Sequence, residues 1–217
     1  MEWHAKNTGA YARESTEAYE NAVLAWGVLQ ARGWSLLAFC GMWGNVGSES
    51  GYNPWRWQSD IVLPEGDPRI TYQNGHAYGL CQWDPADKYI SGGIGYTGYR
   101  PNYSDRPGNP RDGQAQMEFL EDTAVSSGQY FPNPYYNYQI SYDDYKLMTL
   151  DDYTFEYATR AWFHNYERGT WDNQRTISCE YFYYELQGVV PPPPTGSDIP
   201  IWLLFKMKYR NEGKDIV

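Results

Sequence analysis

The segment SLLAFCGMWGNVGSESG, residues 35 to 51, restricts the fold more than any other part of the chain. Its apolar residues recur at helical spacing, and Ser35 precedes them as a residue that can cap a helix N-terminus. Glycine nevertheless recurs every third residue, at Gly41, Gly44 and Gly47, which lowers the helix propensity. We therefore expect a helix that another backbone or a ligand approaches closely.

Four further segments have helical periodicity and end signals. They run from Ser15 to Gln30, from Asp112 to Ser127, from Thr149 to about Arg168, and from Asp172 to about Leu186. Ser15 can cap the first of them, and Thr149 with Asp152 can form a capping pair for the third.

Between residues 51 and 110, Gly, Pro, Asn and Asp interrupt the chain every few positions. This composition predicts an irregular lobe of loops and hairpins, with short strands at 69–72 and 78–83. The order of helices, irregular lobe and helices predicts an α+β, mainly helical domain with a small irregular β lobe.

The C-terminal region has a different composition. Four consecutive prolines, Pro191 to Pro194, predict a stiff spacer, and an apolar run at Ile199–Phe205 precedes basic residues. We therefore predict a catalytic domain over 1–188 and a Pro-linked tail over 189–217. An exposed apolar run promotes aggregation unless it is covered, so we expect the tail to anchor the protein to a partner. The alternative is a linker stub to a further domain.

Charge and composition exclude several functions. The net charge of −10 argues against a nucleic-acid partner. The three cysteines and three histidines are scattered, so we expect no disulfide framework, metal or cofactor. The N-terminus lacks the apolar core of a signal peptide, and no apolar run approaches the ~20 residues of a membrane span. We expect a chain made in the cytoplasm that something else carries to an outside target.

Glu49 is the strongest candidate for catalysis. It lies at the end of the predicted helix, where the helix dipole disfavours a second negative charge. Nearby tryptophans can remove water from its carboxyl; they are Trp43, Trp55, Trp57 and Trp83. Both effects favour the protonated form that a general acid needs to protonate a glycosidic oxygen. An ordinary solvated carboxylate is the simpler reading, but a helix C-terminus disfavours an acidic residue.

Four segments together resemble the phage tail lysozyme family, the wall-degrading domains of phage tail-tip proteins. They are GWSLLAFCGMWGNVGSESGYNPWRWQ, HAYGLCQWDP, QMEFLED and FEYATRAWFHNYERG, and the resemblance extends from about Tyr11 to Gln187. The family is similar to goose-type lysozymes and lytic transglycosylases, which place one Glu at a helix end beside a small β lobe. The resemblance thus implies that Glu49 is the acid.

The same motifs imply substrate contacts. Residues of the YGL.QW motif would line the far wall of the cleft, and packing of the lobe is an equal alternative for Trp83. Tyr166 and Glu167 match the NYE motif, where locking the helix beneath the cleft is as good an explanation as sugar contact. The predicted substrate-binding residues are Trp57, Tyr78, Gly79, Gln82, Trp83 and Tyr166.

A second carboxylate would act on water or on the sugar. Asp60 is the first choice because it follows the Trp-rich loop, and Glu65, Asp67 and Asp84 are alternatives. The resemblance implies cleavage of the β-1,4 bond between N-acetylmuramic acid and N-acetylglucosamine by a virion-associated lysin, with peptidoglycan strands and tail proteins as partners. Lytic transglycosylase chemistry and an inactive glycan-binding tail component are the alternatives.

Overall fold

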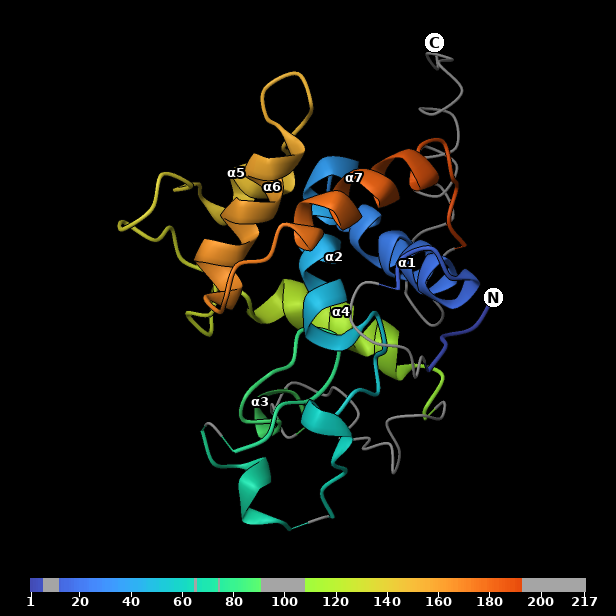
Figure 1. Ribbon diagram of the computed structural model, residues 1–217, viewed down its shortest axis with the longest axis vertical. Coiled ribbons are helices and arrows are strands. Elements are labelled where there is room, and N and C mark those ends of the chain that lie inside the picture. Colours follow the sequence, from blue (N-terminus) through green and yellow to red (C-terminus); the bar gives the residue numbers. More distant parts are fainter. Residues whose placement is uncertain (6–11, 65, 74, 91–107, 193–217) are drawn as a thin grey trace.

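The computed structural model describes residues 1–5, 12–64, 66–73, 75–90 and 108–192. Over these ranges the protein is mainly helical (Figure 1). The α-helices are α1 (Thr16–Gln30), α2 (Leu36–Ser50), α3 (Asp87–Ile90), α4 (Asp112–Thr123), α5 (Tyr142–Lys146), α6 (Phe155–Trp162) and α7 (Gln174–Leu186). Three short helical turns add to them: η1 (Gln58–Asp60), η2 (Pro68–Ile70) and the π-turn η3 (Phe163–Glu167).

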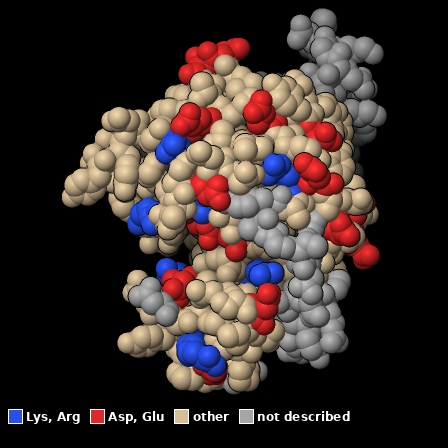
Figure 2. Space-filling model, viewed as in Figure 1, with Lys and Arg blue, Asp and Glu red and all other residues tan. Residues whose placement is uncertain are grey.

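Helix α2 is the centre of the helical body. It packs against α6 and α7, while α1 packs against α4 (Figure 1). The described part of residues 52–90, which we call the lower lobe, lies below α4 in the same view. The surface is indented between the helical body and the lower lobe (Figure 2). Among the described helices, none is both long and apolar enough to cross a membrane.

The glycines of α2 permit the close approach that the sequence predicts. A Cβ added at Gly44 would lie 2.3 Å from the carbonyl oxygen of Arg175 in α7. At Gly41 it would lie 2.9 Å from the carbonyl of Ala158 in α6. Both contacts are to backbone, which cannot rotate away, so α6 and α7 are seated directly on the helix that carries Glu49.

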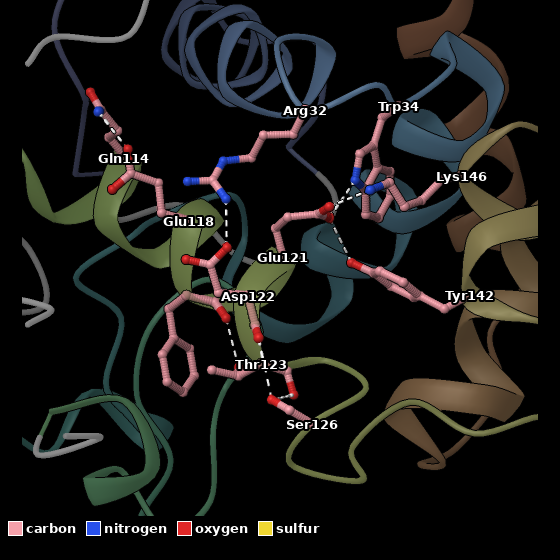
Figure 3. A network of polar contacts seen from close by, with 11 residues as sticks. Arg32, Trp34, Gln114, Glu118, Glu121, Asp122, Thr123, Ser126, Tyr142 and Lys146 are labelled. Carbon is pink, nitrogen blue, oxygen red and sulfur yellow. Dashed lines mark hydrogen bonds and ion pairs between the residues drawn. The ribbon is translucent and has the colours of Figure 1, made fainter. Parts of the chain in front are cut away.

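A polar network joins α4 to the neighbouring helices (Figure 3). The carboxylate of Glu121 accepts hydrogen bonds from Trp34 Nε1 at 2.7 Å and from the Tyr142 hydroxyl at 2.8 Å. Its other oxygen is paired with Lys146 of α5. The Glu121 carboxylate is little exposed to water, but its three donors, one of them positively charged, stabilise its negative charge. The network fixes α5 and the loop between α1 and α2 against α4.

Several predicted elements are confirmed and others need correction. Ser15 and Ser35 cap α1 and α2 through their side chains, as predicted. The third predicted helix instead begins at Phe155 with Thr154 as its cap, because Thr149 and Asp152 close a separate turn. The helix predicted to reach Ser127 ends at Thr123, and α3 and α5 were not predicted.

The predicted β lobe is not confirmed. Residues 69–72 are not a strand, because Asp67 accepts a hydrogen bond from Arg69 N and starts the turn η2. Within the described lower lobe, pairing is limited to isolated bridges that join Tyr78 to Trp57 and to Trp83. Between Tyr78 and Trp83 the chain turns sharply, with positive φ angles at Gly79 and Gln82. The lobe is therefore irregular.

The proline run starts on the surface of α1. A Cβ at Gly27 would lie 2.9 Å from the carbonyl oxygen of Pro192 and 3.1 Å from Pro191 Cβ. The predicted tail beyond this point lies outside the described residues, so the division at residue 188 stays a prediction.

A buried aspartate holds the lower lobe against α4. Asp112 is fully buried in the first turn of α4, and its two carboxylate oxygens accept hydrogen bonds from the hydroxyls of Tyr78 and Tyr89, at 2.6 and 2.5 Å. Burial raises the pKa of Asp112 to about 7, although these hydrogen bonds oppose the rise. The folded protein therefore keeps this carboxyl protonated in a range where the unfolded chain does not.

This difference predicts a pH-dependent stability. The ordinary pKa of Asp is about 4, so the contribution of Asp112 is complete below pH ~4 and is lost as the pH rises to about 7. Relative to an Asp112→Asn variant, the wild type should lose about 3 to 4 kcal/mol of unfolding free energy over this range. Urea unfolding at several pH values measures the difference. A constant gap between the two proteins would contradict the assignment.

Candidate active site

Glu49 lies in the last turn of α2, two residues before a left-handed Gly51 (φ 60°) that ends the helix. Its side chain is 24% exposed, so solvent or a ligand can reach it. The Oε1 atom lies 2.9 Å from Nη2 of Arg175. The sequence thus places a carboxyl at a helix end, and the fold supplies an arginine beside it.

Arg175 comes from the first turns of α7 and is buried, with 3% of its surface exposed. Its Nη1 donates to Asn45 Oδ1 at 3.0 Å, and its guanidinium lies 5.0 Å from the centre of the Phe163 ring. Gly44 makes this position possible, because any side chain there would collide with the Arg175 carbonyl. The arginine is therefore held rigidly beside Glu49.

A second carboxyl, Glu167 of η3, interacts electrostatically with Glu49. Trp162 Nε1 donates to Glu167 Oε1 at 3.2 Å. Burial raises the pKa of Glu167 well above its usual range, the charge of Glu49 raises it further, and Arg175 opposes both. Glu167 therefore favours its protonated form near neutral pH, beside the charge of Glu49. We call these two carboxyl groups the Glu49–Glu167 pair.

The turn that contains Cys81 lies close to this pair. Burial, followed by the charges of Glu167 and Glu49, raises the pKa of the Cys81 thiol. Two residues further, Trp83 Nε1 donates to the hydroxyl of Tyr166 at 3.0 Å. Tyr166 in turn stacks on Trp162, with ring centroids 4.5 Å apart. Lower lobe and η3 therefore meet in one hydrogen-bonded aromatic wall next to the carboxyl pair.

Four of the predicted substrate-binding residues lie in or against the turn between Tyr78 and Trp83. Trp57 and Tyr78 are fully buried and pack with ring centroids 4.8 Å apart. Gly79 has a left-handed φ of 86°, which favours glycine, and a Cβ there would lie 2.6 Å from Gln116 Oε1. Gln82 Nε2 donates to the carbonyls of Arg56 and Gly79, at 3.0 and 2.9 Å. These contacts shape the lobe, and direct contact of the four with sugar stays a prediction.

A model of the phage tail lysozyme family matches residues 20–184, about three quarters of the chain. The chain belongs to the phage tail lysozyme family. Morphogenesis protein 1 of Bacillus phage B103 is 36% identical over 110 residues, which are 51% of this chain and 24% of that protein. The chain thus spans about a quarter of the length of this relative.

In this phage tail lysozyme, Asp60 forms an ion pair with an arginine of the lower lobe. Its side chain is 48% exposed and lies 3.1 Å from Arg56 Nη2, within the lower lobe. Its role as second carboxylate stays untested. Trp43, which was expected to desolvate Glu49, instead stacks on Phe39 and Tyr52 in the core.

Sequence reasoning missed two members of the site. Arg175 lies 126 residues from Glu49, and no motif marks it. The only sign of it was indirect: the glycines of α2 indicated that some backbone approaches there. Glu167 was noted as part of the NYE motif but not as a partner of Glu49. Their proximity follows from the packing of α7 and of α6, which continues into η3, on α2, and no local pattern encodes this packing.

Proposed function

We propose that this phage tail lysozyme hydrolyses the β-1,4 bond between N-acetylmuramic acid and N-acetylglucosamine in peptidoglycan. Glu49 is the general acid. The observation that carries the proposal is the Glu49–Glu167 pair with the buried Arg175, in a member of this family. Glycoside hydrolysis needs one carboxyl that gives a proton and a carboxylate that compensates positive charge, and the pair supplies both states.

Glu49 and Glu167 have different roles in this proposal. Glu167 holds the proton in the free protein, because burial and the Glu49 charge raise its pKa. Its Trp162 hydrogen bond keeps it in place, whereas Glu49 lies at the open end of α2. We assign proton delivery to Glu49 and proton storage to Glu167. Arg175 orients Glu49 and limits the repulsion within the pair.

In the reaction, the glycosidic oxygen takes the proton as its bond to the anomeric carbon breaks. Water then adds its hydroxyl to that carbon, and its remaining proton passes to a carboxylate. Exchange with solvent returns a proton to the carboxyl pair, so the site is restored. Trp83 and Tyr166 are both buried, so the aromatic wall holds the lower lobe against η3 beside the carboxyl pair. Asp60 remains our first candidate for a carboxylate that activates the water.

Family membership also supports a proposal for how the enzyme reaches the cell wall. We propose that a phage virion carries the enzyme as part of its tail, where it opens the host wall. The Pro-linked tail is then the segment that anchors it to other virion proteins. Deleting residues 191–217 should leave peptidoglycan cleavage intact and abolish incorporation into particles.

Mass spectrometry of the products tests the reaction. Purified peptidoglycan digested with the wild type should give muropeptides with a free reducing end. Anhydro-muropeptides, lighter by one water, would show that the sugar's own 6-hydroxyl replaces water and would assign a lytic transglycosylase instead. Binding without any soluble product would identify an inactive glycan-binding component.

A further inference from the structure

An open pocket of about 440 Å³ lies next to the proposed active site, between the end of α4, α3 and η3. Its aromatic side is shared with the wall described above, through Trp83 and Tyr166. The other lining residues are Lys88, Phe119, Thr123, Ser126, Ser127 and Gln129. Glu167 directly follows Tyr166, so the pocket and the carboxyl pair share the element η3.

The hydroxyl groups of three lining residues already donate their hydrogens to backbone carbonyls. The hydroxyl of Thr123 donates to the Phe119 carbonyl at 2.6 Å, and that of Ser127 donates to the Thr123 carbonyl at 2.6 Å. Ser126 donates to the carbonyl of Asp122 at 3.3 Å (Figure 3). A hydroxyl has a single hydrogen, so these oxygens can offer a ligand only lone pairs, and Ser127 Oγ already accepts a hydrogen bond from Gln129 N at 3.3 Å. The pocket therefore favours a ligand that brings N–H or O–H donors.

Lys88 gives the pocket its charge. It is the single charged residue among those that line it, and its side chain is exposed. In the described part of the chain, no carboxylate forms an ion pair with it. An ammonium group at the rim favours a ligand with a carboxylate. The aromatic side, with Phe119 at its edge, favours small apolar groups.

Amide N–H groups, a free carboxylate and small apolar side chains occur together in a short peptide. A bare glycan strand of N-acetylglucosamine has amides and hydroxyls but no carboxylate. We infer that this pocket receives the peptide stem that peptidoglycan carries on the lactyl group of N-acetylmuramic acid. Lys88 pairs with a stem carboxylate, and the acceptors at the end of α4 receive its amide N–H groups. The inference rests on the proposed function and specifies which part of the substrate is recognised beyond the sugar.

Calorimetric titration with N-acetylmuramyl-L-alanyl-D-isoglutamine tests the inference. This ligand has one sugar and a free carboxylate but no glycosidic bond between sugars, so the wild type binds it without turnover. Lys88→Ala should raise its Kd about threefold, as expected for a solvent-exposed charge pair. Ser126→Trp, at an exposed position, should fill the pocket and raise the Kd at least tenfold. The Kd for chitotriose, which has no peptide, should stay unchanged in Lys88→Ala.

Arg69→Ala is the matched control, since it removes the same charge from an exposed site on η2 and should leave both Kd values unchanged. Lys88→Arg should bind the muramyl dipeptide like the wild type. Absence of muramyl dipeptide binding, binding unaffected by both pocket variants, or an equal loss for chitotriose would overturn the inference. The titration is independent of catalysis, so an active Glu49→Gln protein would refute the proposed acid and leave the pocket assignment standing.

Discussion

Glu49→Gln is expected to lower the rate of peptidoglycan cleavage about a thousandfold, because an amide has no proton to transfer to the glycosidic oxygen. The fold should persist. The amide oxygen of Gln can still accept the hydrogen bond from Arg175 Nη2, which lies 2.9 Å from Glu49 Oε1. Clearing of purified peptidoglycan measures the rate, and thermal unfolding measures the fold.

Glu156→Gln is the matched control for this variant. Glu156 is an exposed residue of α6 that pairs with Arg160 one turn away, so its neutralisation should change neither activity nor folding. Cleavage by Glu49→Gln at the wild-type rate would refute the acid assignment. A loss of activity in both variants would instead attribute the effect to overall charge.

Gly44→Ala is expected to destabilise the protein by about 3 kcal/mol, the upper part of the range for overpacking a core. The new Cβ would lie 2.3 Å from Arg175 O and 3.1 Å from Cys179 N, both backbone atoms of α7. The gain in helix propensity from Gly to Ala is only about 1 kcal/mol and does not offset the collision. Urea unfolding measures the loss.

The same variant should also lose activity, because α7 must move and takes Arg175 away from Glu49. Gly169→Ala is the control: a Cβ there has no neighbour within 4 Å, so the stability should change by less than about 0.5 kcal/mol. A Gly44→Ala protein as stable as the wild type would show that α2 and α7 are not in the close contact described.

Local signals in the sequence predicted the helices well. The side chains of Ser15 and Ser35 accept hydrogen bonds from backbone N–H groups three residues further on, and Gly51 ends α2 in a left-handed conformation. These signals are local, so they can be predicted from the sequence without tertiary structure. The lower lobe was predicted less well. Its short apolar segments have the composition of strands, but the turns between them leave only isolated bridges.

The site was predictable only in part, for a related reason. Glu49 could be singled out because its helix end and its motif are both local. Arg175 and Glu167 reach Glu49 through the packing of α7 and of α6, which continues into η3, on α2. A sequence pattern does not record which side chains meet across such contacts. The glycines predicted that a backbone approaches α2 but not which one.

The contact of Pro191 and Pro192 with Gly27 has a mechanical consequence. A chain segment that makes no contact with its domain transmits only a pulling force to that domain. A segment that packs on a helix, as Pro191 and Pro192 pack on α1, can also transmit torque. Through α1, which packs on α2 and α4, a load applied at Pro192 reaches the helix that carries Glu49. The orientation of α1, and with it that of α2, is therefore coupled to any force that acts on the chain at Pro192.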